Sequence, residues 1–282
     1  MTGWVEETLH GDLHIKLRAD KVLYDSDTEH QRLVIFENAT FGRVMALDGV
    51  MQTTEADEFI YHEMLAHLPI TAHGRVRKVL IIGGGDGGML EEVLKHRAVE
   101  KVTMVDIDDT VVELAKRYFR RICGEAFEDP RTDLVIADGT EFVKDCRERY
   151  DLIIVDSTDP IGPGEVLFTR QFYGDCKACL AEGGVIATQN GVPFLQGGEL
   201  TGTLTALRPL FADAACYLAT VPTYVGGPMA FGWASDNAGL RRVDLETLRT
   251  RWAEAGIETR YYTPEVHLAA FALPPYIAAL IA

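Results

Sequence analysis

The chain has 282 residues, 47% of them hydrophobic, and a formal net charge of -16 because 43 acidic residues outnumber 27 lysines and arginines. This apolar content is ample for a buried core and predicts a globular protein. The acidity argues against a nucleic-acid-binding protein, since phosphate contacts need basic patches; it would attract cationic ligands, although solubility alone also favours an acidic surface.

The N-terminal stretch MTGWVEETLH has neither the basic start nor the apolar core of a signal peptide. No apolar run in the sequence is long enough to cross a bilayer. We therefore expect a cytoplasmic protein with no membrane partner.

The first 65 residues differ in texture from the rest of the chain. Residues 1–65 hold short β-branched and aromatic runs separated by turns that contain Asn or Gly, which predicts a small antiparallel sheet. From Val79 onward, apolar strands alternate with amphipathic helices. This alternation predicts a parallel sheet covered on both faces, so we expect a doubly wound α/β domain over residues 66–282.

The glycine-rich stretch VLIIGGGDGG carries a carboxylate, Asp86, where a nucleotide-binding turn would cradle phosphate. A phosphate about 4 Å from Asp86 would cost on the order of 4 kcal/mol at an effective dielectric of 20. A dinucleotide is therefore disfavoured, and a nucleoside with a cationic substituent, as in the S-adenosyl compounds, is favoured. The alternative is that Asp86 only caps the following helix.

Aspartates also follow three predicted strands of the second domain, at Asp106, Asp138 and Asp156. Ligands of open parallel sheets lie beyond the carboxyl ends of the strands, so these side chains should line one crevice with Asp86. Asp106 lies 20 residues after Asp86, the spacing at which nucleotide-binding α/β folds place an acid on the ribose hydroxyls.

The segment VDSTDPIGPGE, at the end of the fourth predicted strand, places Asp156 and Asp159 three residues apart. They would repel each other unless a cation lay between them, which indicates a polyamine or a metal. The metal is disfavoured because His62 and His67 are five residues apart, whereas two zinc-binding histidines on one helical face are four apart. A polyamine fits better, since each ammonium donates hydrogen bonds to carboxylates. An Asx turn is the alternative.

The pair Cys176 and Cys179 forms a C-x-x-C within QFYGDCKACLAEGG. We predict a helix that ends at the glycine pair, and we interpret the two cysteines as buried thiols, in preference to a redox or zinc pair.

Taken together, the segments FGRVMALDGVMQTTEADEFIYHEM, VLIIGGGDGG, TDPIGPGEVLF, QNGV, VPTYVGG and YYTPEVHLAAFALP resemble the spermidine synthase, or polyamine aminopropyltransferase, family. The resemblance covers nearly the whole chain. It implies an N-terminal β domain followed by a Rossmann-like, methyltransferase-type sheet, and transfer of the aminopropyl group of decarboxylated S-adenosylmethionine to putrescine. It also implies no metal, no cofactor besides the two substrates, and a homodimer or homotetramer.

The resemblance assigns residues to the two substrates. The donor site is implied to contain Gln31, His62, Asp86, Asp106, Asp138, Gly139 and Pro163. The acceptor site is implied to contain Tyr61, His62, Asp86, Asp156, Asp159, Gln189 and Tyr224. In this assignment Asp86 holds the donor amine and opposes the carboxylate of intact S-adenosylmethionine.

The expected reaction is a single in-line displacement in which Asp156 accepts the proton of the attacking amine, Tyr61 assists it and Asp159 anchors the acceptor. Three alternatives remain: another acceptor such as cadaverine, agmatine or spermidine; a methyltransferase that uses intact S-adenosylmethionine; and a polyamine-binding protein without activity.

Overall fold

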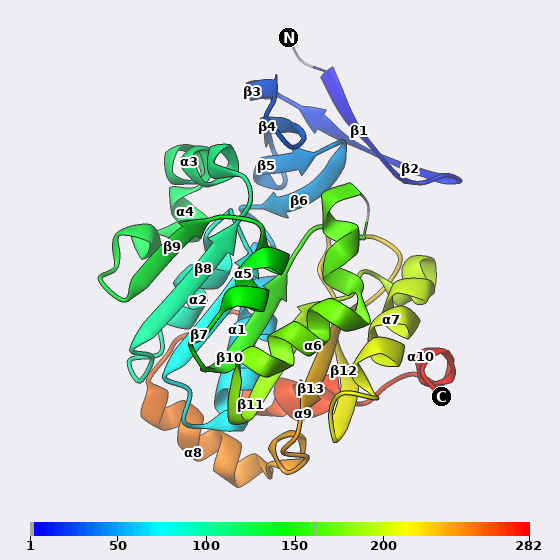
Figure 1. Cartoon of the computed structure of the whole chain (residues 1–282). Helices are drawn as coiled ribbons and strands as arrows, with labels where there is room; N and C mark the ends of the chain where they lie inside the picture. The colour runs from blue at the N-terminus through cyan, green and yellow to red at the C-terminus, as the bar shows by residue number, and fades with distance from the viewer. Residues whose placement is uncertain (1–2, 161) are drawn as a thin grey trace.

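The computed structural model describes residues 3–160 and 162–282, without the side chains of Thr8 and Pro163. Within these residues the strands form a two-stranded, a four-stranded and a seven-stranded sheet. The two small sheets make up an N-terminal β region, drawn in blue in Figure 1, and the large sheet with its helices forms the rest of the molecule.

The N-terminal β region is antiparallel throughout. Its strands are β1 (Gly3–His10), β2 (Leu13–Ala19), β3 (Lys21–Asp27), β4 (Arg32–Asn38), β5 (Gly42–Leu47) and β6 (Val50–Thr54). The sequence predicted one small sheet, but β1 and β2 form a hairpin of their own beside the sheet β3-β4-β5-β6. The chain turns between them at Asp20, whose carboxylate accepts hydrogen bonds from Arg18 Nε and the Ala39 N–H. The predicted antiparallel β domain is confirmed.

The seven-stranded sheet is mostly parallel. It contains β7 (Lys78–Gly83), β8 (Lys101–Asp106), β9 (Thr132–Ile136), β10 (Tyr150–Asp156), β11 (Leu180–Gln189), β12 (Asp213–Ala219) and β13 (Met229–Ser235). In the order β12-β13-β11-β10-β7-β8-β9, the run from β11 to β9 is parallel, while β13 pairs antiparallel with both β11 and β12.

Helices cover both faces of this sheet (Figure 1). They are α1 (Glu58–His73), α2 (Gly88–Leu94), α3 (Asp109–Tyr118), α4 (Arg120–Cys123), α5 (Gly139–Asp145), α6 (Arg170–Cys179), α7 (Pro193–Leu207), α8 (Leu245–Ala255), α9 (Pro264–Ala270) and α10 (Pro275–Leu280), with short 3-10 helices η1 (Ala126–Glu128), η2 (Gly162–Phe168) and η3 (Leu240–Arg242). Helices α1 and α2 contact one face, and α5, α6 and α7 contact the other. The predicted doubly wound α/β class is confirmed.

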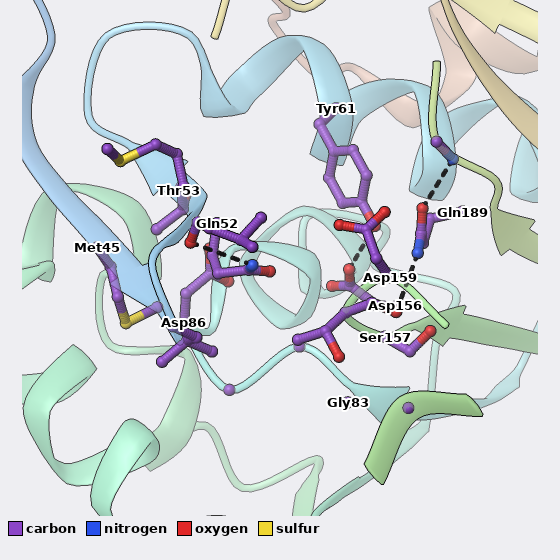
Figure 2. A pocket seen from close by; sticks show the side chains of 18 of the residues that line it. Met45, Gln52, Thr53, Tyr61, Gly83, Asp86, Asp156, Ser157, Asp159 and Gln189 are labelled. Atoms are coloured by element: carbon purple, nitrogen blue, oxygen red, sulfur yellow. Dashed lines mark hydrogen bonds between the residues drawn. The ribbon is translucent and has the colours of Figure 1, made fainter. Parts of the chain in front are cut away.

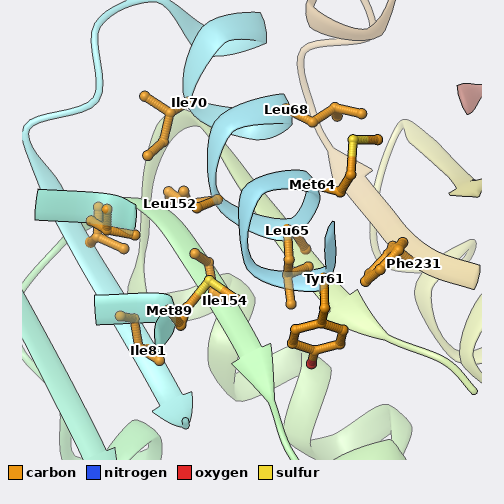
Figure 3. Close-up of a cluster of buried hydrophobic side chains, with 14 of the residues drawn as sticks. Tyr61, Met64, Leu65, Leu68, Ile70, Ile81, Met89, Leu152, Ile154 and Phe231 are labelled. Carbon is orange, nitrogen blue, oxygen red and sulfur yellow. The ribbon is translucent and has the colours of Figure 1, made fainter. Parts of the chain in front are cut away.

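The two faces of the sheet are both apolar, which explains the continuous hydrophobic strands in the sequence. Along β7, Val79 and Ile81 belong to the core under α1, whereas Leu80 and Ile82 belong to the core on the opposite face. Figure 3 shows Tyr61 at the edge of the α1 core, where its hydroxyl points away from the apolar side chains. The N-terminal end of α1 therefore places the Tyr61 hydroxyl at the carboxyl edge of the sheet.

Helix α1 joins the two parts of the chain. The expected division between residues 65 and 66 lies inside this helix and stays a prediction. The N-terminal sheet packs on the large domain through an apolar cluster that includes Ile35 and Met45 from the sheet, and Leu114 and Phe119 from the α3–α4 segment. This contact holds the small sheet above the carboxyl ends of the large one.

The C-x-x-C pair lies at the end of α6. The prediction that this helix ends at Gly183 and Gly184 is wrong, because α6 ends at Cys179 and β11 begins at Leu180. Cys176 and Cys179 are 0% and 1% exposed, so the interpretation as buried thiols is confirmed. Burial raises the pKa of both thiols. Among the described helices, none has the length and apolar character that crossing a membrane requires.

Candidate active site

A cavity of about 660 Å³ lies between the carboxyl edge of the large sheet and the small N-terminal sheet. Its floor comes from the ends of β7, β8 and β10, and Met45, Gln52 and Thr53 line it from the N-terminal sheet (Figure 2). The sequence-predicted residues that line it are Gln31, Tyr61, His62, Asp86, Asp106, Asp138, Gly139, Asp156, Asp159, Gln189 and Tyr224. The remaining one, Pro163, belongs to η2, but its side chain is outside the described part of the chain.

The glycine-rich loop approaches the end of β10 so closely that side chains would not fit. A Cβ on Gly83 would lie 2.1 Å from the Asp156 carbonyl oxygen, and Gly83 has a φ of +85°. The Gly84 N–H donates a hydrogen bond of 2.9 Å to the same carbonyl. The loop is thereby fixed beside Asp156, which brings Asp86 and Asp156 to one cavity.

Three carboxylates that the family resemblance assigns to the donor site are held by backbone N–H groups two residues further along. Asp86 Oδ1 accepts from the Gly88 N–H at 2.9 Å, Asp106 Oδ1 from the Asp108 N–H at 2.8 Å and Asp138 Oδ1 from the Thr140 N–H at 2.7 Å. Asp138 is the N-cap of α5, and β9 ends two residues before it. The alternative, that Asp86 is only the N-cap of α2, is wrong: the N-cap residue is Gly87, without a side-chain cap, and Asp86 lies one residue before it and lines the cavity.

The pKa values of two of these carboxyls differ because their surroundings differ. Burial raises the pKa of Asp106 to about 6, against the lowering effect of the Asp108 N–H. For Asp138, burial acts in the same direction, but hydrogen bonds from the Thr140 hydroxyl and N–H outweigh it, and the pKa is lowered. Asp138 therefore keeps its charge to lower pH than Asp106 does.

His62 lies between two carboxylates. Its Nδ1 is 2.8 Å from Glu58 Oε2, and its Nε2 is 3.5 Å from Asp86 Oδ1. Burial lowers the pKa of His62, but Asp86 and Glu58 outweigh that effect and raise the pKa to about 10. The imidazole is a buried cation at neutral pH.

Asp156 and Tyr61 form a hydrogen-bonded pair at the floor of the cavity (Figure 2), in which Tyr61 is buried and Asp156 is partly buried. The Tyr61 hydroxyl donates a hydrogen bond of 2.5 Å to Asp156 Oδ1. Burial raises the pKa of Asp156 to about 6, Asp86 acts in the same direction, and His62 and the Tyr61 hydroxyl oppose it. Burial and Asp156 keep the pKa of Tyr61 well above its usual value. The pair is thus a neutral phenol that donates to a carboxylate of raised proton affinity.

The turn that follows β10 carries Asp159, which Gln196 of α7 holds through a 2.7 Å hydrogen bond from its Nε2. Gln189 supports the same turn: its Nε2 donates to the Thr158 carbonyl at 3.2 Å, and its Oε1 accepts from the Gly191 N–H at 3.0 Å. Both polar atoms of Gln189 therefore bond to backbone. Burial raises the pKa of Asp159, and the Gln196 hydrogen bond opposes this.

Several residues that organise the cavity were missed from the sequence. Asp108 N-caps α3, accepts from the Thr28 hydroxyl at 2.7 Å and also accepts from Gln31 Nε2 at 3.2 Å, so it ties the loop between β3 and β4 to the start of α3. Its position directly before a helical pattern was a signal for a cap. Gln196 had no such signal, because it lies within α7 at a point where the helix is kinked.

Asp57 was also missed, although it precedes α1 as an N-cap residue would. Its carboxylate accepts from the Thr54 hydroxyl at 2.6 Å, from the Thr223 N–H at 2.7 Å and from the Thr223 hydroxyl at 2.6 Å. It thus clamps the loop that carries Tyr224, whose hydroxyl donates to the Gln52 carbonyl.

His67, the second histidine of YHEMLAH, points into a separate buried cluster, where its Nδ1 is 2.9 Å from His96 Nε2 and its Nε2 is 2.9 Å from Glu92 Oε2. No group of three or more His, Cys, Asp or Glu residues in the described chain is arranged to hold a metal ion.

Two family models match the chain. The spermine/spermidine synthase domain matches residues 58–245, and the spermidine synthase tetramerisation domain matches residues 3–55.

Similar proteins match nearly the whole chain. A polyamine aminopropyltransferase of Ruegeria sp. (strain TM1040) is 60% identical over 98% of both chains. Polyamine aminopropyltransferase 1 of Pseudomonas aeruginosa is 59% identical, over 96% of this chain and 95% of its own. A crystal structure of spermidine synthase in complex with the transition-state analogue AdoDATO superposes with a TM-score of 0.94 at 39% identity, over 99% of this chain and 94% of that one. The spermidine synthase of Thermotoga maritima gives a TM-score of 0.91 at 37% identity, with the same coverage.

Proposed function

The chain belongs to the spermine/spermidine synthase family and is a polyamine aminopropyltransferase, and from this premise we propose that it is a spermidine synthase. It transfers the aminopropyl group of decarboxylated S-adenosylmethionine to putrescine, and the products are spermidine and methylthioadenosine. Asp156 accepts the proton of the attacking amine.

The observation that carries this proposal is the charge of the cavity wall. Its described lining contains carboxylates and histidines but neither lysine nor arginine; the carboxylates are Glu7, Asp48, Asp57, Glu58, Asp86, Asp106, Asp138, Asp156 and Asp159. Such a wall favours ligands with several positive charges. Both proposed substrates meet this requirement, because the donor carries a sulfonium and an ammonium and putrescine carries two ammonium groups.

On the donor side, we assign the ribose hydroxyls to Asp106, the adenine to Asp138 and Gly139, and the terminal ammonium to Asp86, with Gln31 and Pro163 nearby. Intact S-adenosylmethionine carries a carboxylate beside that ammonium. Its repulsion from Asp86 would cost on the order of 4 kcal/mol at 4 Å, or about a thousandfold in affinity. This argues against the methyltransferase alternative.

On the acceptor side, we assign Asp156 and Asp159 to the two amines of putrescine, with Tyr61, Gln189 and Tyr224 around them. The attacking amine must first lose a proton, which at pH 7 costs about 4.6 kcal/mol for a pKa near ~10.4. The raised pKa of Asp156, about 6, makes it a better proton acceptor than an ordinary aspartate. The amine lone pair then attacks the methylene carbon and the carbon–sulfur bond breaks. The electron pair of that bond stays on the sulfur, which departs as a neutral thioether.

Longer acceptors are the second candidate, because Glu7 and His10 also line the cavity, at an end where both lie near enough to Asp159 to interact with its charge. Cadaverine, agmatine and spermidine would reach this end with their second amine or guanidinium group. The test is an acceptor panel with decarboxylated S-adenosylmethionine, read by mass spectrometry. Spermidine as the main product supports the proposal; methyl transfer from intact S-adenosylmethionine, or binding of putrescine without turnover, contradicts it.

A homo-oligomer, a dimer or a tetramer, is also proposed. The support is the match of residues 3–55 to a model described as a tetramerisation domain, together with exposed apolar side chains in the same region, of which Trp4 is 65% exposed. Light scattering on the whole protein and on Trp4→Ser would test this. The cytoplasmic location stays a prediction.

A further inference from the structure

His62 contacts the cavity at the point where the proposed donor ammonium would bind. Its side chain reaches this point because Gly88, at the start of α2, leaves room: a Cβ there would lie 2.3 Å from His62 Cε1. Nε2 faces Asp86 at 3.5 Å, and Nδ1 faces Glu58 at 2.8 Å. The side chain of His62 is only 4% exposed, so water screens these charges little.

The groups around His62 come from four elements. Glu58 lies on its own helix, Asp86 on the loop after β7 and Asp156 at the end of β10, and all three favour its protonation. Glu91 of α2 lies close enough to Glu58 to repel it. The neighbouring Tyr61 ring packs edge-on at 5.2 Å between ring centroids. In the empty site the imidazolium therefore neutralises one of several clustered carboxylates.

We propose that His62 sets the charge of the donor subsite: it is protonated in the empty site and releases its Nε2 proton to solvent when decarboxylated S-adenosylmethionine binds. This inference rests on the proposed function, because it needs the donor ammonium at Asp86. The donor ammonium and the His62 imidazolium would compete for the Asp86 carboxylate. Two positive charges beside the same carboxylate repel each other strongly in a buried site.

Loss of the Nε2 proton changes His62 from a competitor into a ligand. Nδ1–H continues to donate to Glu58, which selects the neutral tautomer whose Nε2 lone pair faces Asp86. The donor ammonium can then donate to both Asp86 Oδ1 and His62 Nε2. The charge of the Glu58, His62 and Asp86 group changes from -1 to -2 as the doubly positive donor enters.

The same proton affects the choice between the two S-adenosyl compounds. A protonated His62 can donate its Nε2–H to the carboxylate of intact S-adenosylmethionine, whereas a neutral His62 cannot. We therefore expect the preference for the decarboxylated donor to increase with pH, and His62 is a specificity-determining residue.

The test is calorimetric titration of the whole protein with decarboxylated S-adenosylmethionine in two buffers of different ionisation enthalpy, between about pH 7 and pH 8.5, with no acceptor present. We expect about 0.5 to 1 proton released per donor, and a donor affinity that rises about threefold to tenfold per pH unit. Methylthioadenosine, which has the same nucleoside but no ammonium or sulfonium, should release no proton.

His62→Gln keeps a side chain that can bond to Asp86 and Glu58 but cannot titrate, so its donor affinity should be independent of pH. Glu58→Gln should reduce the number of protons released. The matched control is His73→Gln, at the other end of α1 and absent from the described cavity lining, which should behave as the parent. Methylthioadenosine binding checks that each variant keeps its nucleoside site.

Donor binding without proton release, or with the same pH slope in the parent and in His62→Gln, would overturn the role of His62. If a separate assay with putrescine still forms methylthioadenosine, the proposed function is left intact. Failure of the donor to bind, or of putrescine to react, would contradict the proposed function itself. If His62→Gln does not fold, the comparison of donor with methylthioadenosine on the parent protein still decides.

Discussion

The two ends of the cavity hold their carboxylates by different means. On the donor side, Asp86, Asp106 and Asp138 each accept a backbone N–H two residues along the chain. On the acceptor side, Asp156 accepts from Tyr61 of α1, and Asp159 accepts from Gln196 of α7. The first set is oriented by the local strand-to-helix turn, and the second by side chains from distant segments.

This difference matches the chemistry that we propose for each end. A carboxylate that only binds a ligand and takes no proton is served by a backbone N–H, which stabilises its ionised form. A carboxylate that must take a proton needs a higher pKa, and the burial of Asp156 against a phenol provides it. Asp106 departs from the rule, since its pKa is also raised to about 6 despite its backbone partner.

The largest expected effect is that of Asp156→Asn. The amide still accepts from Tyr61 but cannot take a proton, so turnover with putrescine should fall about a thousandfold, within the range for loss of a general base. Donor affinity, measured by calorimetry, should change less than about threefold. If Asp156→Asn kept more than about a tenth of the parent turnover, Asp156 would not be the general base.

Next in size is Asp86→Asn, which keeps an oxygen for the Gly88 N–H but loses the charge. We expect donor affinity to fall about a hundredfold and intact S-adenosylmethionine to be rejected less strongly, since both effects depend on that charge. Asp138→Asn is the matched control: it likewise keeps an oxygen for the N–H two residues along the chain, but beside the uncharged adenine that we propose, and it should cost less than tenfold, about 1.4 kcal/mol. An equal loss of donor affinity in the two variants would contradict the idea that the charge of Asp86 binds the donor ammonium.

The third prediction concerns stability. Because the pKa of Asp156 is raised from 3.8 to about 6, the folded state binds this proton more tightly than the unfolded state, and stability is lost as pH rises through this window. Asp156→Asn should therefore raise the free energy of unfolding by about 2 to 3 kcal/mol at pH 8 and by nearly nothing at pH 4. Urea denaturation at both pH values checks this; equal stabilities at pH 8 would refute it.

The smallest effect is on the pH profile. Protonated Asp156 cannot act as a base, so kcat at saturating donor should fall about tenfold per pH unit below a pH of about 6. Asp106 titrates in the same range but acts on donor binding, so Asp106→Asn should keep this limb of the kcat profile. If Asp106→Asn lost the acid limb, the limb would report the protonation of Asp106, which contradicts its assignment to Asp156.

Much of the candidate site could be predicted from the sequence because strand ends and glycine turns are local signals. Asp86, Asp106 and Asp156 were selected by their position after apolar strands, and all three line one cavity. The assignment of Tyr61, Gln189 and Tyr224 depended on a family resemblance. Asp57, Asp108 and Gln196 were missed, since each acts by bonding to a segment far away in the chain.

The sequence by itself determined the fold class and the acidity of the site, because hydrophobic periodicity and the residues at turns are properties of short segments. Only the tertiary structure decided which carboxylates are fixed anions and which can take a proton. Burial and the Tyr61 hydroxyl set the proton affinity of Asp156, and this arrangement exists only when α1 packs against β10.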